Sequence, residues 1–183
     1  MHNESVANEK TIQPHSIVKV GDREYEIVRL LGKGKGGYSY LASCGEEFFV
    51  VKQIHHEPCD YYNFGDKIQA ELNDYKKLLL AEIRIPKMIS FDTKAERIVK
   101  EYIDGPTIDF LVKQNAVPQK CFTQVREMAK KAKQKNLNID FYPTNFIAKN
   151  EILYYIDYET NEYSDEWNFE NWGKKYWQNA ALL

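Results

Sequence analysis

The chain has 183 residues, of which 43% are hydrophobic and 28% charged, with a formal net charge of −2. This length suggests one domain or one two-lobed unit, and a charge so close to zero excludes the broadly basic surface of a general nucleic-acid binder. No apolar run approaches the roughly 18 residues of a membrane-spanning helix, so we expect no membrane partner.

The N-terminal segment MHNESVANEKTIQPHS is polar and has no apolar stretch of the kind found in signal peptides. We therefore expect residues 1–15 to form a mobile tail.

The three cysteines, Cys44, Cys59 and Cys121, lack CxxC spacing. Neither a zinc site nor a disulfide framework is expected. This cysteine usage fits a reducing compartment, and we expect a cytoplasmic protein.

Short β-branched and aromatic segments separated by turn sequences predict an antiparallel sheet in the first half of the chain. The expected strands are 16–20, 24–31, 38–44, 46–54, 88–92 and 97–103. One helix is expected between them, over residues 65–83, with Asp66 near its N-cap. Its apolar stripe is formed by Ile68, Leu72, Tyr75, Leu79 and Ile83, which recur at intervals of three and four.

The second half of the chain reads as mainly helical. We expect helices over 107–114 and 118–136, followed by a small hairpin within 136–159. The tail 160–183 is aromatic and acidic, and its three tryptophans, Trp167, Trp172 and Trp177, are expected to act as packing anchors. The predicted fold class is α+β, in three parts: the tail 1–15, a sheet-rich lobe over 16–103 and a shorter, mainly helical lobe over 104–183.

A glycine-rich turn lies between two of the expected strands. Gly32, Gly34 and Gly37 form the pattern G-x-G-x-x-G in LGKGKGGYSY. Glycines let backbone amides approach phosphate oxygens closely. A dinucleotide-binding turn or a Walker loop requires a helix immediately afterwards, and a strand is expected instead. The pattern therefore favours a hairpin that covers phosphates, and the alternative is a flexible turn.

Two charged residues follow this turn. Lys52 ends an apolar strand, and Glu71 lies near the edge of the helical stripe. Each by itself is explained by an ordinary solvated position. Together, a strand lysine and a helix glutamate can form an ion pair that directs the ammonium group at a nucleotide's phosphates.

Three polar residues end apolar segments in the expected hairpin. Asp140 and Asn145 follow the pattern D-x-x-x-x-N, and Asp157 comes after the strand ILYYI. Carboxylate and amide oxygens from adjacent loops can hold Mg²⁺, and a separate carboxylate can accept a proton from an attacking hydroxyl. The alternative is that these side chains stabilise their own turns.

The ordered set of a glycine-rich hairpin, strand lysine, helix glutamate, D-x-x-x-x-N and final aspartate resembles the protein-kinase-like fold over residues 24–159. This resemblance implies the following roles. The glycines cover the phosphates of ATP, and Lys52 contacts those phosphates and pairs with Glu71. Glu101 to Ile103 form the hinge that binds adenine, with Lys100 at the back of the pocket. Asp140 is the catalytic base, and Asn145 and Asp157 hold Mg²⁺.

The chain departs from typical protein kinases at several points. Asn138 and Ile139 replace His-Arg, and Tyr158 and Glu159 replace Phe-Gly. We expect no full activation segment, because the sequence lacks Ala-Pro-Glu and is short after Asp157. The departures resemble RIO-like minimal kinases, and IDYE resembles the corresponding segment of choline and aminoglycoside kinases. The expected function is an atypical Ser/Thr protein kinase that uses ATP and Mg²⁺. The alternatives are a small-molecule kinase and a nucleotide-binding pseudokinase, and the hydroxyl acceptor, protein or metabolite, stays open.

Overall fold

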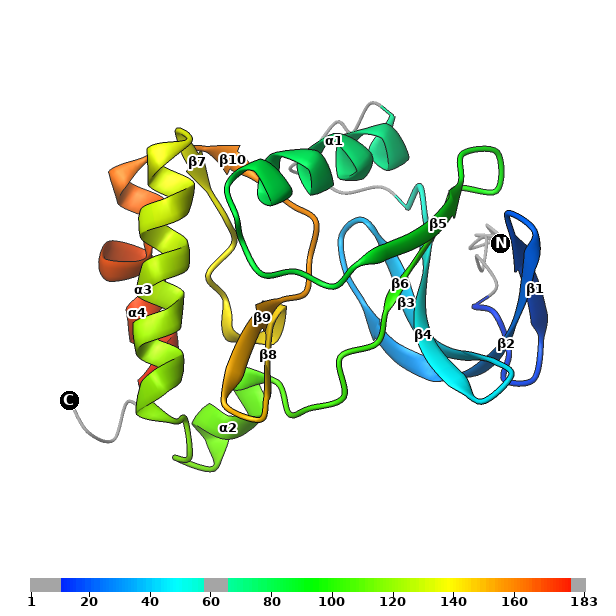
Figure 1. Ribbon diagram of the computed structural model, residues 1–183, viewed down its shortest axis with the longest axis horizontal. Coiled ribbons are helices and arrows are strands. Elements are labelled where there is room, and N and C mark those ends of the chain that lie inside the picture. The colour runs from blue at the N-terminus through cyan, green and yellow to red at the C-terminus, as the bar shows by residue number, and fades with distance from the viewer. Residues whose placement is uncertain (1–10, 58–65, 179–183) are drawn as a thin grey trace, which may run out of the picture. The chain divides into compact units, whose positions relative to one another are not determined.

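Six antiparallel strands form the sheet of the first half of the chain (Figure 1). The computed structural model describes residues 11–57 and 66–178. The strands follow the order β1-β2-β3-β4-β6-β5 across the sheet. They are β1 (Ile17–Val20), β2 (Arg23–Lys33), β3 (Gly37–Cys44), β4 (Glu47–Ile54), β5 (Met88–Asp92) and β6 (Arg97–Glu101). The six strands predicted from the sequence are confirmed, with boundary differences of a few residues.

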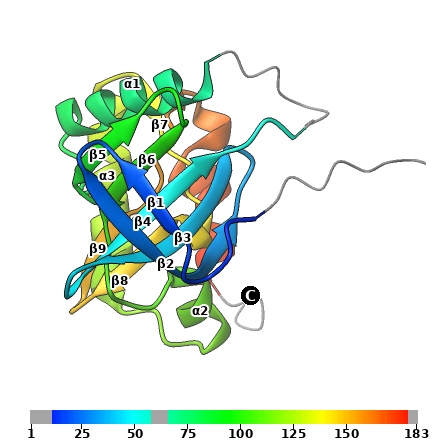
Figure 2. The ribbon, with the colours of Figure 1, turned by 90° about the vertical axis from the view of Figure 1, so that its right-hand side faces the viewer.

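The sheet curls around one of its faces, which Figure 2 shows from the side of β1 and β2. Alternate residues of the strands meet there in a buried apolar cluster, in which Tyr25 packs edge-on against Phe49 at 5.5 Å between ring centroids. The cluster consists of Val18, Val20, Tyr25, Ile27, Tyr38, Tyr40, Ala42, Phe49, Val51 and Val99. The period-two alternation of strands explains why the neighbours of these residues face the other way.

The segment before β1 is attached to the sheet. The backbone N–H of Ile12 donates to the Tyr40 hydroxyl at 3.0 Å, and that of His15 donates to the Ile27 carbonyl at 2.7 Å. The part of the expected mobile tail that falls on residues 1–10 lies outside the described residues. Within the described residues, Ile12 and His15 already contact the sheet, because their backbone amides find partners on β3 and β2.

Helix α1 spans Lys67–Leu80 and confirms the predicted helix. Leu72 is buried as predicted, and near the end of the helix Leu78 has no exposed surface, whereas Leu79 is 51% exposed. The expected placement of Leu79 in the apolar stripe is therefore wrong. The reason lies in the helix end. Glu82 has a φ of 53°, and the amides of Glu82 and Ile83 donate to the carbonyls of Leu79 and Leu78. This arrangement commonly packs the residue after the turn against the third-last helical residue, and both Ile83 and Leu78 are buried.

The chain divides into two compact units. The first unit contains Met1–Ile68 and Met88–Tyr102, and the second contains Gln69–Lys87 and Ile103–Leu183. The sequence interpretation placed the lobe boundary one residue later, after 103, and assigned the whole helix to the first lobe. Most of α1 instead groups with the second unit, and its side-chain contacts described below explain this.

The second unit is built from short elements (Figure 1). Strands β8 and β9 form a hairpin, and β7 pairs with β10. The elements are α2 (Ile108–Lys113), α3 (Gln119–Gln134), β7 (Leu137–Asn138), the 3₁₀ turn η1 (Pro143–Asn145), β8 (Phe146–Lys149), β9 (Ile152–Tyr155), β10 (Asn161–Glu162), the 3₁₀ turn η2 (Asp165–Trp167), the π-helical turn η3 (Phe169–Gly173) and α4 (Lys174–Trp177). The predicted helices and hairpin are confirmed. The fold class is α+β, with a curled antiparallel sheet and a few helices.

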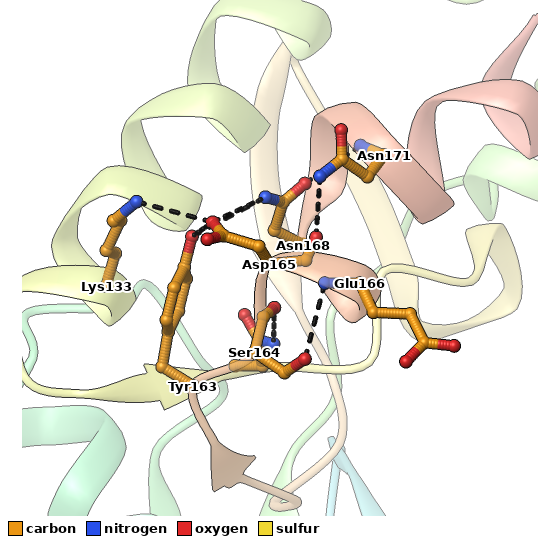
Figure 3. Close-up of polar contacts among 8 residues, drawn as sticks. Lys133, Tyr163, Ser164, Asp165, Glu166, Asn168 and Asn171 are labelled. Carbon is orange, nitrogen blue, oxygen red and sulfur yellow. Dashed lines mark hydrogen bonds and ion pairs between the residues drawn. The ribbon is translucent and has the colours of Figure 1, made fainter.

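Side chains fix the segment after β10 to α3, as Figure 3 shows. The carboxylate of Asp165 accepts a hydrogen bond from the Tyr163 hydroxyl at 2.5 Å and pairs with Lys133 of α3 at 3.6 Å. The tyrosine bond, followed by the lysine charge, lowers the pKa of Asp165 below its usual range. Ser164 and Asn168 cap the two turns that follow, by accepting from the amides of Glu166 and Asn171. Polar contacts thereby hold this segment in addition to the packing of its aromatic residues.

Of the three tryptophans, Trp177 is the buried anchor. Its indole N–H donates to the Phe141 carbonyl at 2.8 Å, and its ring lies 5.0 Å from Phe146 and 5.5 Å from Phe169. Trp167 and Trp172 also pack, at 5.7 Å between their ring centroids, but Trp167 is half exposed, so of the three expected packing anchors Trp177 is the one enclosed in the core. Within the described residues, no helix has both the length and the apolar character needed to cross a membrane.

Candidate functional site

The glycine-rich turn joins β2 to β3 in the first unit. The Gly34 amide donates to the Gly37 carbonyl at 2.9 Å and closes the turn. A Cβ on Gly37 would lie 2.4 Å from the carbonyl oxygen of Gln53, so the close approach of β4 requires glycine at this position. Among the described atoms, a Cβ on Gly32 would meet nothing within 4 Å, and one on Gly34 would meet only the Gly37 carbonyl at 3.9 Å. Gly37 therefore has a structural role, whereas Gly32 and Gly34 have exposed positions at which a side chain would meet little of the described protein.

A histidine that the sequence interpretation missed holds the tip of this turn. Nε2 of the buried His55 lies 3.0 Å from the Gly34 carbonyl, and the His55 amide donates to the Gly36 carbonyl at 3.4 Å. A carbonyl can only accept, so Nε2 carries the proton, and Nδ1 accepts from the Glu57 amide at 3.2 Å. The turn is thus fixed to the chain that follows β4.

Glu57 forms a second link between the same two segments. Its carboxylate pairs with Lys33 and accepts from the Tyr38 hydroxyl at 2.6 Å. The bond from Lys33, followed by that from Tyr38, lowers the pKa of Glu57 below its ordinary value. His55 and Glu57 carry no sequence signal for this role, because their partners are identified only once β2, β3 and β4 pair.

Lys52 lies on the face of the sheet opposite the buried cluster. Its neighbour Val51 is opposite Tyr40 and Val99, which belong to the cluster, whereas Lys52 is opposite Ser39 and Ile98. Residues directly opposite each other on neighbouring strands point to the same face of the sheet, and successive residues along one strand point to opposite faces. By the same alternation Lys100, which is opposite Val50, shares the face of Lys52. The two lysines expected at a nucleotide site therefore project from neighbouring strands to one side of the sheet.

The expected hinge begins where β6 ends. Glu101 is the last residue of β6 and is exposed, and Ile103 is buried. The chain beyond it is fastened to β8. The Ala148 amide donates to the Pro106 carbonyl at 3.0 Å, and a Cβ on Gly105 would lie 2.5 Å from the Ala148 carbonyl. Gly105 is therefore required by this close approach, which fixes the path of the chain into α2.

Asp140 lies at the start of a short loop between β7 and η1. Its carboxylate Oδ1 accepts from the Tyr142 amide at 3.0 Å, and its carbonyl accepts from Nδ2 of Asn145 at 3.4 Å. The first bond is the turn-stabilising contact that the sequence interpretation gave as an alternative. The side chain remains half exposed, so this turn presents the carboxylate at the surface in a fixed direction.

Asn145 and Asp157 are brought side by side by the β8–β9 hairpin. Phe146 is opposite Tyr155 in the hairpin, and the Ile156 amide donates to the Asn145 carbonyl at 2.9 Å. The residue after Ile156 is Asp157, which is half buried and accepts from the Tyr158 amide at 2.9 Å. Because Nδ2 of Asn145 bonds to Asp140, the amide oxygen is the group of Asn145 that can act as a cation ligand.

The carboxylates of this loop region gather near the hydroxyl of Tyr155. Burial raises the pKa of Tyr155 well above its ordinary value, and the charges of Asp157, Glu159 and Asp140 raise it further. The charges of Asp140, Asp157 and Glu159, all in the second unit, thus act on the same buried phenol. Tyr155 is another site residue that the sequence interpretation missed.

Helix α1 is fastened to the chain just beyond Asp157. The carboxylate of Asp74 accepts from the Thr160 amide at 3.0 Å and from its hydroxyl at 2.8 Å. One residue further along the helix, the ring of Tyr75 lies 4.8 Å from that of Tyr158. Glu71 precedes Asp74 by about one helical turn and is half buried. These contacts fix the part of the helix that carries Glu71 relative to the Asp157 segment. The ion pair between Glu71 and Lys52, which belongs to the first unit, stays a prediction.

Four aromatic residues form a cluster next to the Asp140 loop. Tyr142 lies 5.1 Å from Tyr176 and 6.5 Å from Trp172, and Trp172 lies 5.7 Å from Trp167. Tyr142 is 39% exposed and Trp167 is 50% exposed. An accessible aromatic surface therefore lies two residues from the candidate base.

The candidate magnesium ligands are few but of suitable chemistry. Among residues 11–57 and 66–178, no group of three or more His, Cys, Asp or Glu side chains could hold a metal ion. Asn145 and Asp157 offer two hard oxygen ligands. Mg²⁺ commonly uses one or two protein ligands and completes its shell with water and substrate phosphates. The donor set therefore fits Mg²⁺ bound together with a nucleotide.

Comparisons with known proteins give no assignment. A scan with protein-family models and a search of curated protein sequences both find no match to this chain.

Proposed function

We propose that the chain is a phosphotransferase of the protein-kinase-like fold, which uses ATP and Mg²⁺ to phosphorylate a hydroxyl group. The order of motifs along the sequence supports this, and so do the two units. Lys52 and Lys100 project to one side of the sheet in the first unit, which also carries the exposed glycine-rich turn. Asp140, Asn145 and Asp157 gather in the second unit.

The observation that carries the proposal is the hydrogen bond from the Ile156 amide to the Asn145 carbonyl, at 2.9 Å. It lies next to the Phe146–Tyr155 pair of the β8–β9 hairpin and brings the end of D-x-x-x-x-N next to Asp157, which follows β9 by two residues. An amide oxygen and a carboxylate at this junction would hold Mg²⁺, which neutralises phosphate charge when bound.

The reaction assigns a distinct step to each group. The acceptor hydroxyl oxygen forms a bond to the γ-phosphorus of ATP, while the bond from that phosphorus to the β–γ bridging oxygen breaks and ADP leaves. The hydroxyl proton passes to the carboxylate of Asp140, which is half exposed and can be reached by an acceptor. In this proposal Lys52 neutralises phosphate charge, and Glu71 orients the ammonium group of Lys52.

The acceptor we propose is a serine or threonine hydroxyl of a protein. A small alcohol is the second candidate, because the half-exposed aromatic cluster of Tyr142, Trp167, Trp172 and Tyr176 offers a compact organic molecule a binding surface near Asp140. The bond from the Tyr142 amide to Asp140 favours a third candidate, a pseudokinase in which this aspartate only stabilises its turn.

Nucleotide binding is tested by the thermal shift of the full chain with ATP and Mg²⁺. At a ligand concentration of about 100 times Kd the folded state gains roughly 2.7 kcal/mol, which corresponds to an increase in melting temperature of about 5–10 °C. Asp157→Asn should remove most of this shift. Asp109→Asn is the matched control, since Asp109 pairs with Lys113 on the surface of α2. Absence of a shift in the wild type, or an undiminished one in Asp157→Asn, contradicts the proposal.

Transfer itself is tested with γ-labelled ATP against a panel of basic and neutral proteins and of small alcohols. Label on a protein serine or threonine supports the protein-kinase proposal, and label on a small alcohol supports the second candidate. ATP binding without transfer to any member of the panel, or to water, supports the pseudokinase.

A further inference from the structure

The side chain of Tyr155 is enclosed at the centre of the second unit. It lies on β9, has no exposed surface, and its ring packs 5.2 Å from that of Phe146. Apolar contacts of this kind would be satisfied by phenylalanine. The hydroxyl group is the part of the side chain that needs a separate explanation, because a buried hydroxyl is costly unless it is hydrogen-bonded.

The hydroxyl bonds to the backbone of two different loops. The Asp140 amide donates to it at 3.4 Å, and the hydroxyl donates its proton to the Glu159 carbonyl at 3.0 Å. Asp140 begins the loop after β7, and Glu159 lies two residues beyond Asp157 in the segment after β9. One side chain therefore bridges the segment of the candidate base and the segment of the candidate metal ligand.

The chemistry of the site keeps this bridge intact. A phenol that loses its proton can no longer donate to Glu159, but burial and the surrounding carboxylates raise the pKa of Tyr155 far above neutrality. Proton donation to the Glu159 carbonyl is thus maintained throughout the neutral range. The bridge is a fixed structural link, and it does not act as an acid or base.

A second tyrosine in the same segment provides the comparison. Tyr158 is 2% exposed, and its hydroxyl donates to the Pro86 carbonyl at 2.7 Å. Both residues are tyrosines, both side chains are buried, and each hydroxyl donates a hydrogen bond to a backbone carbonyl. They differ in the bonds of the hydroxyl: that of Tyr155 bonds to Asp140 and Glu159, and that of Tyr158 bonds to Pro86.

We propose that Tyr155 is a positioning residue whose hydroxyl sets the separation of Asp140 and Asp157 for phosphoryl transfer. This inference rests on the proposed phosphotransferase function. Residues that orient functional groups in this way typically change metal affinity or activity by about 10–100-fold when they are altered, and displacements near 1 Å can have effects of this size.

The test compares Tyr155→Phe with Tyr158→Phe in the full chain. Three measurements are made: amide hydrogen exchange at Asp140, the Mg²⁺ concentration needed for half of the maximal ATP-induced thermal shift, and the rate of γ-phosphate transfer from ATP to water. Tyr155→Phe should speed exchange at the Asp140 amide, raise the Mg²⁺ requirement and lower the transfer rate, the last two by about 10–100-fold. Tyr158→Phe keeps the amide that bonds to Asp157 and the ring that packs against Tyr75, and removes the hydroxyl that bonds to Pro86. It should lower the melting temperature to a similar degree and leave all three near the wild-type values.

The outcomes separate this inference from the function on which it rests. If the wild type binds ATP and Mg²⁺ but the two variants behave alike, the positioning role is wrong and the phosphotransferase proposal stands. If the wild type binds no ATP, both are wrong. Should Tyr155→Phe melt at a lower temperature than Tyr158→Phe, the comparison is made at a temperature where both are folded. Unchanged exchange at Asp140 there also overturns the inference.

Discussion

The two units hold their candidate groups in different ways. In the first unit, Lys52 and Lys100 occupy positions in a continuous antiparallel ladder, and the register of β4 and β6 sets where they project. In the second unit, Asp140 and Asp157 lie in loops. The carboxylates of Asp140 and Asp157 accept from the amides of Tyr142 and Tyr158, and the Asp140 amide donates to the Tyr155 hydroxyl. A ladder distributes the constraint over many backbone bonds, whereas a loop depends on a few specific groups.

This difference has a consequence for mutation. Conservative changes in the first unit should mainly alter stability, since the ladder maintains the register until the sheet is lost. Conservative changes at Asp140 and Asp157 themselves should alter chemistry at nearly unchanged stability, because one bond can shift one functional group. The turn between β2 and β3 is intermediate, as it depends on both the ladder at Gly37 and the side chains of His55 and Glu57.

The largest effect is expected from Asp140→Asn. The amide is nearly isosteric with the carboxylate and its oxygen can still accept from Tyr142, but it cannot take up a proton. Transfer of label from ATP should fall by about 10²–10⁴-fold, while the thermal shift with ATP and Mg²⁺ is retained. Asp109→Asn again serves as control. Equal transfer by the wild type and Asp140→Asn would show that the loop aspartate has only a turn-stabilising role.

Two substitutions in the glycine-rich turn separate an effect on protein stability from an effect on ATP binding. In Gly37→Ala the new methyl group collides with the Gln53 carbonyl of β4, so the free energy of unfolding should fall by about 1–3 kcal/mol. In Gly32→Ala the methyl group enters open space, and stability should hold while the ATP-induced thermal shift decreases. Urea denaturation and thermal shift measure the two effects. An equally stable Gly37→Ala would contradict the close approach of the strands.

The link between α1 and the Asp157 segment should respond to loss of a single hydroxyl. Thr160→Val keeps the shape of the side chain but removes the bond from Oγ1 to Asp74. A hydrogen bond to a charged group contributes about 1.5–3 kcal/mol, so the free energy of unfolding should fall by up to that amount. Thr160→Ser keeps the hydroxyl and should restore most of the loss. If serine and valine give the same unfolding curve, the bond contributes nothing.

The smallest expected effect is the pH dependence of stability that comes from Glu57, which links the β2–β3 turn to the chain after β4. Because Lys33 and Tyr38 lower the pKa of this carboxyl from its ordinary 4.5, its contribution is fully present above pH 4.5 and is lost as the pH falls through the lowered pKa. Solvent screens this exposed pair, so the effect should be small and smaller still in salt. Melting temperatures of the wild type and Glu57→Gln, measured at low salt, should differ above pH 4.5 and converge below it. Curves that stay parallel down to pH 3 would contradict this linkage.

Local sequence patterns were sufficient for most elements of the fold. Strand alternation and turn residues located β1 to β6, because the side-chain period of two and the demands of tight turns are properties of the chain itself. The period of the helix located α1 and its buried Leu72, but not the leucine that is buried near the end of the helix. With Leu78, Leu79 and Leu80 in succession, the C-terminal turn at Glu82 decides which of them is enclosed.

For the candidate site, the sequence by itself determined which groups are present and their order: Gly32, Gly34 and Gly37, then Lys52, Glu71, Asp140, Asn145 and Asp157. Only the tertiary structure decided what holds them. The bonds of His55, Asp74 and Tyr155 join residues between 4 and 86 positions apart. A local pattern carries no information about such partners, because the pairing exists only after strands and loops distant along the chain have come together.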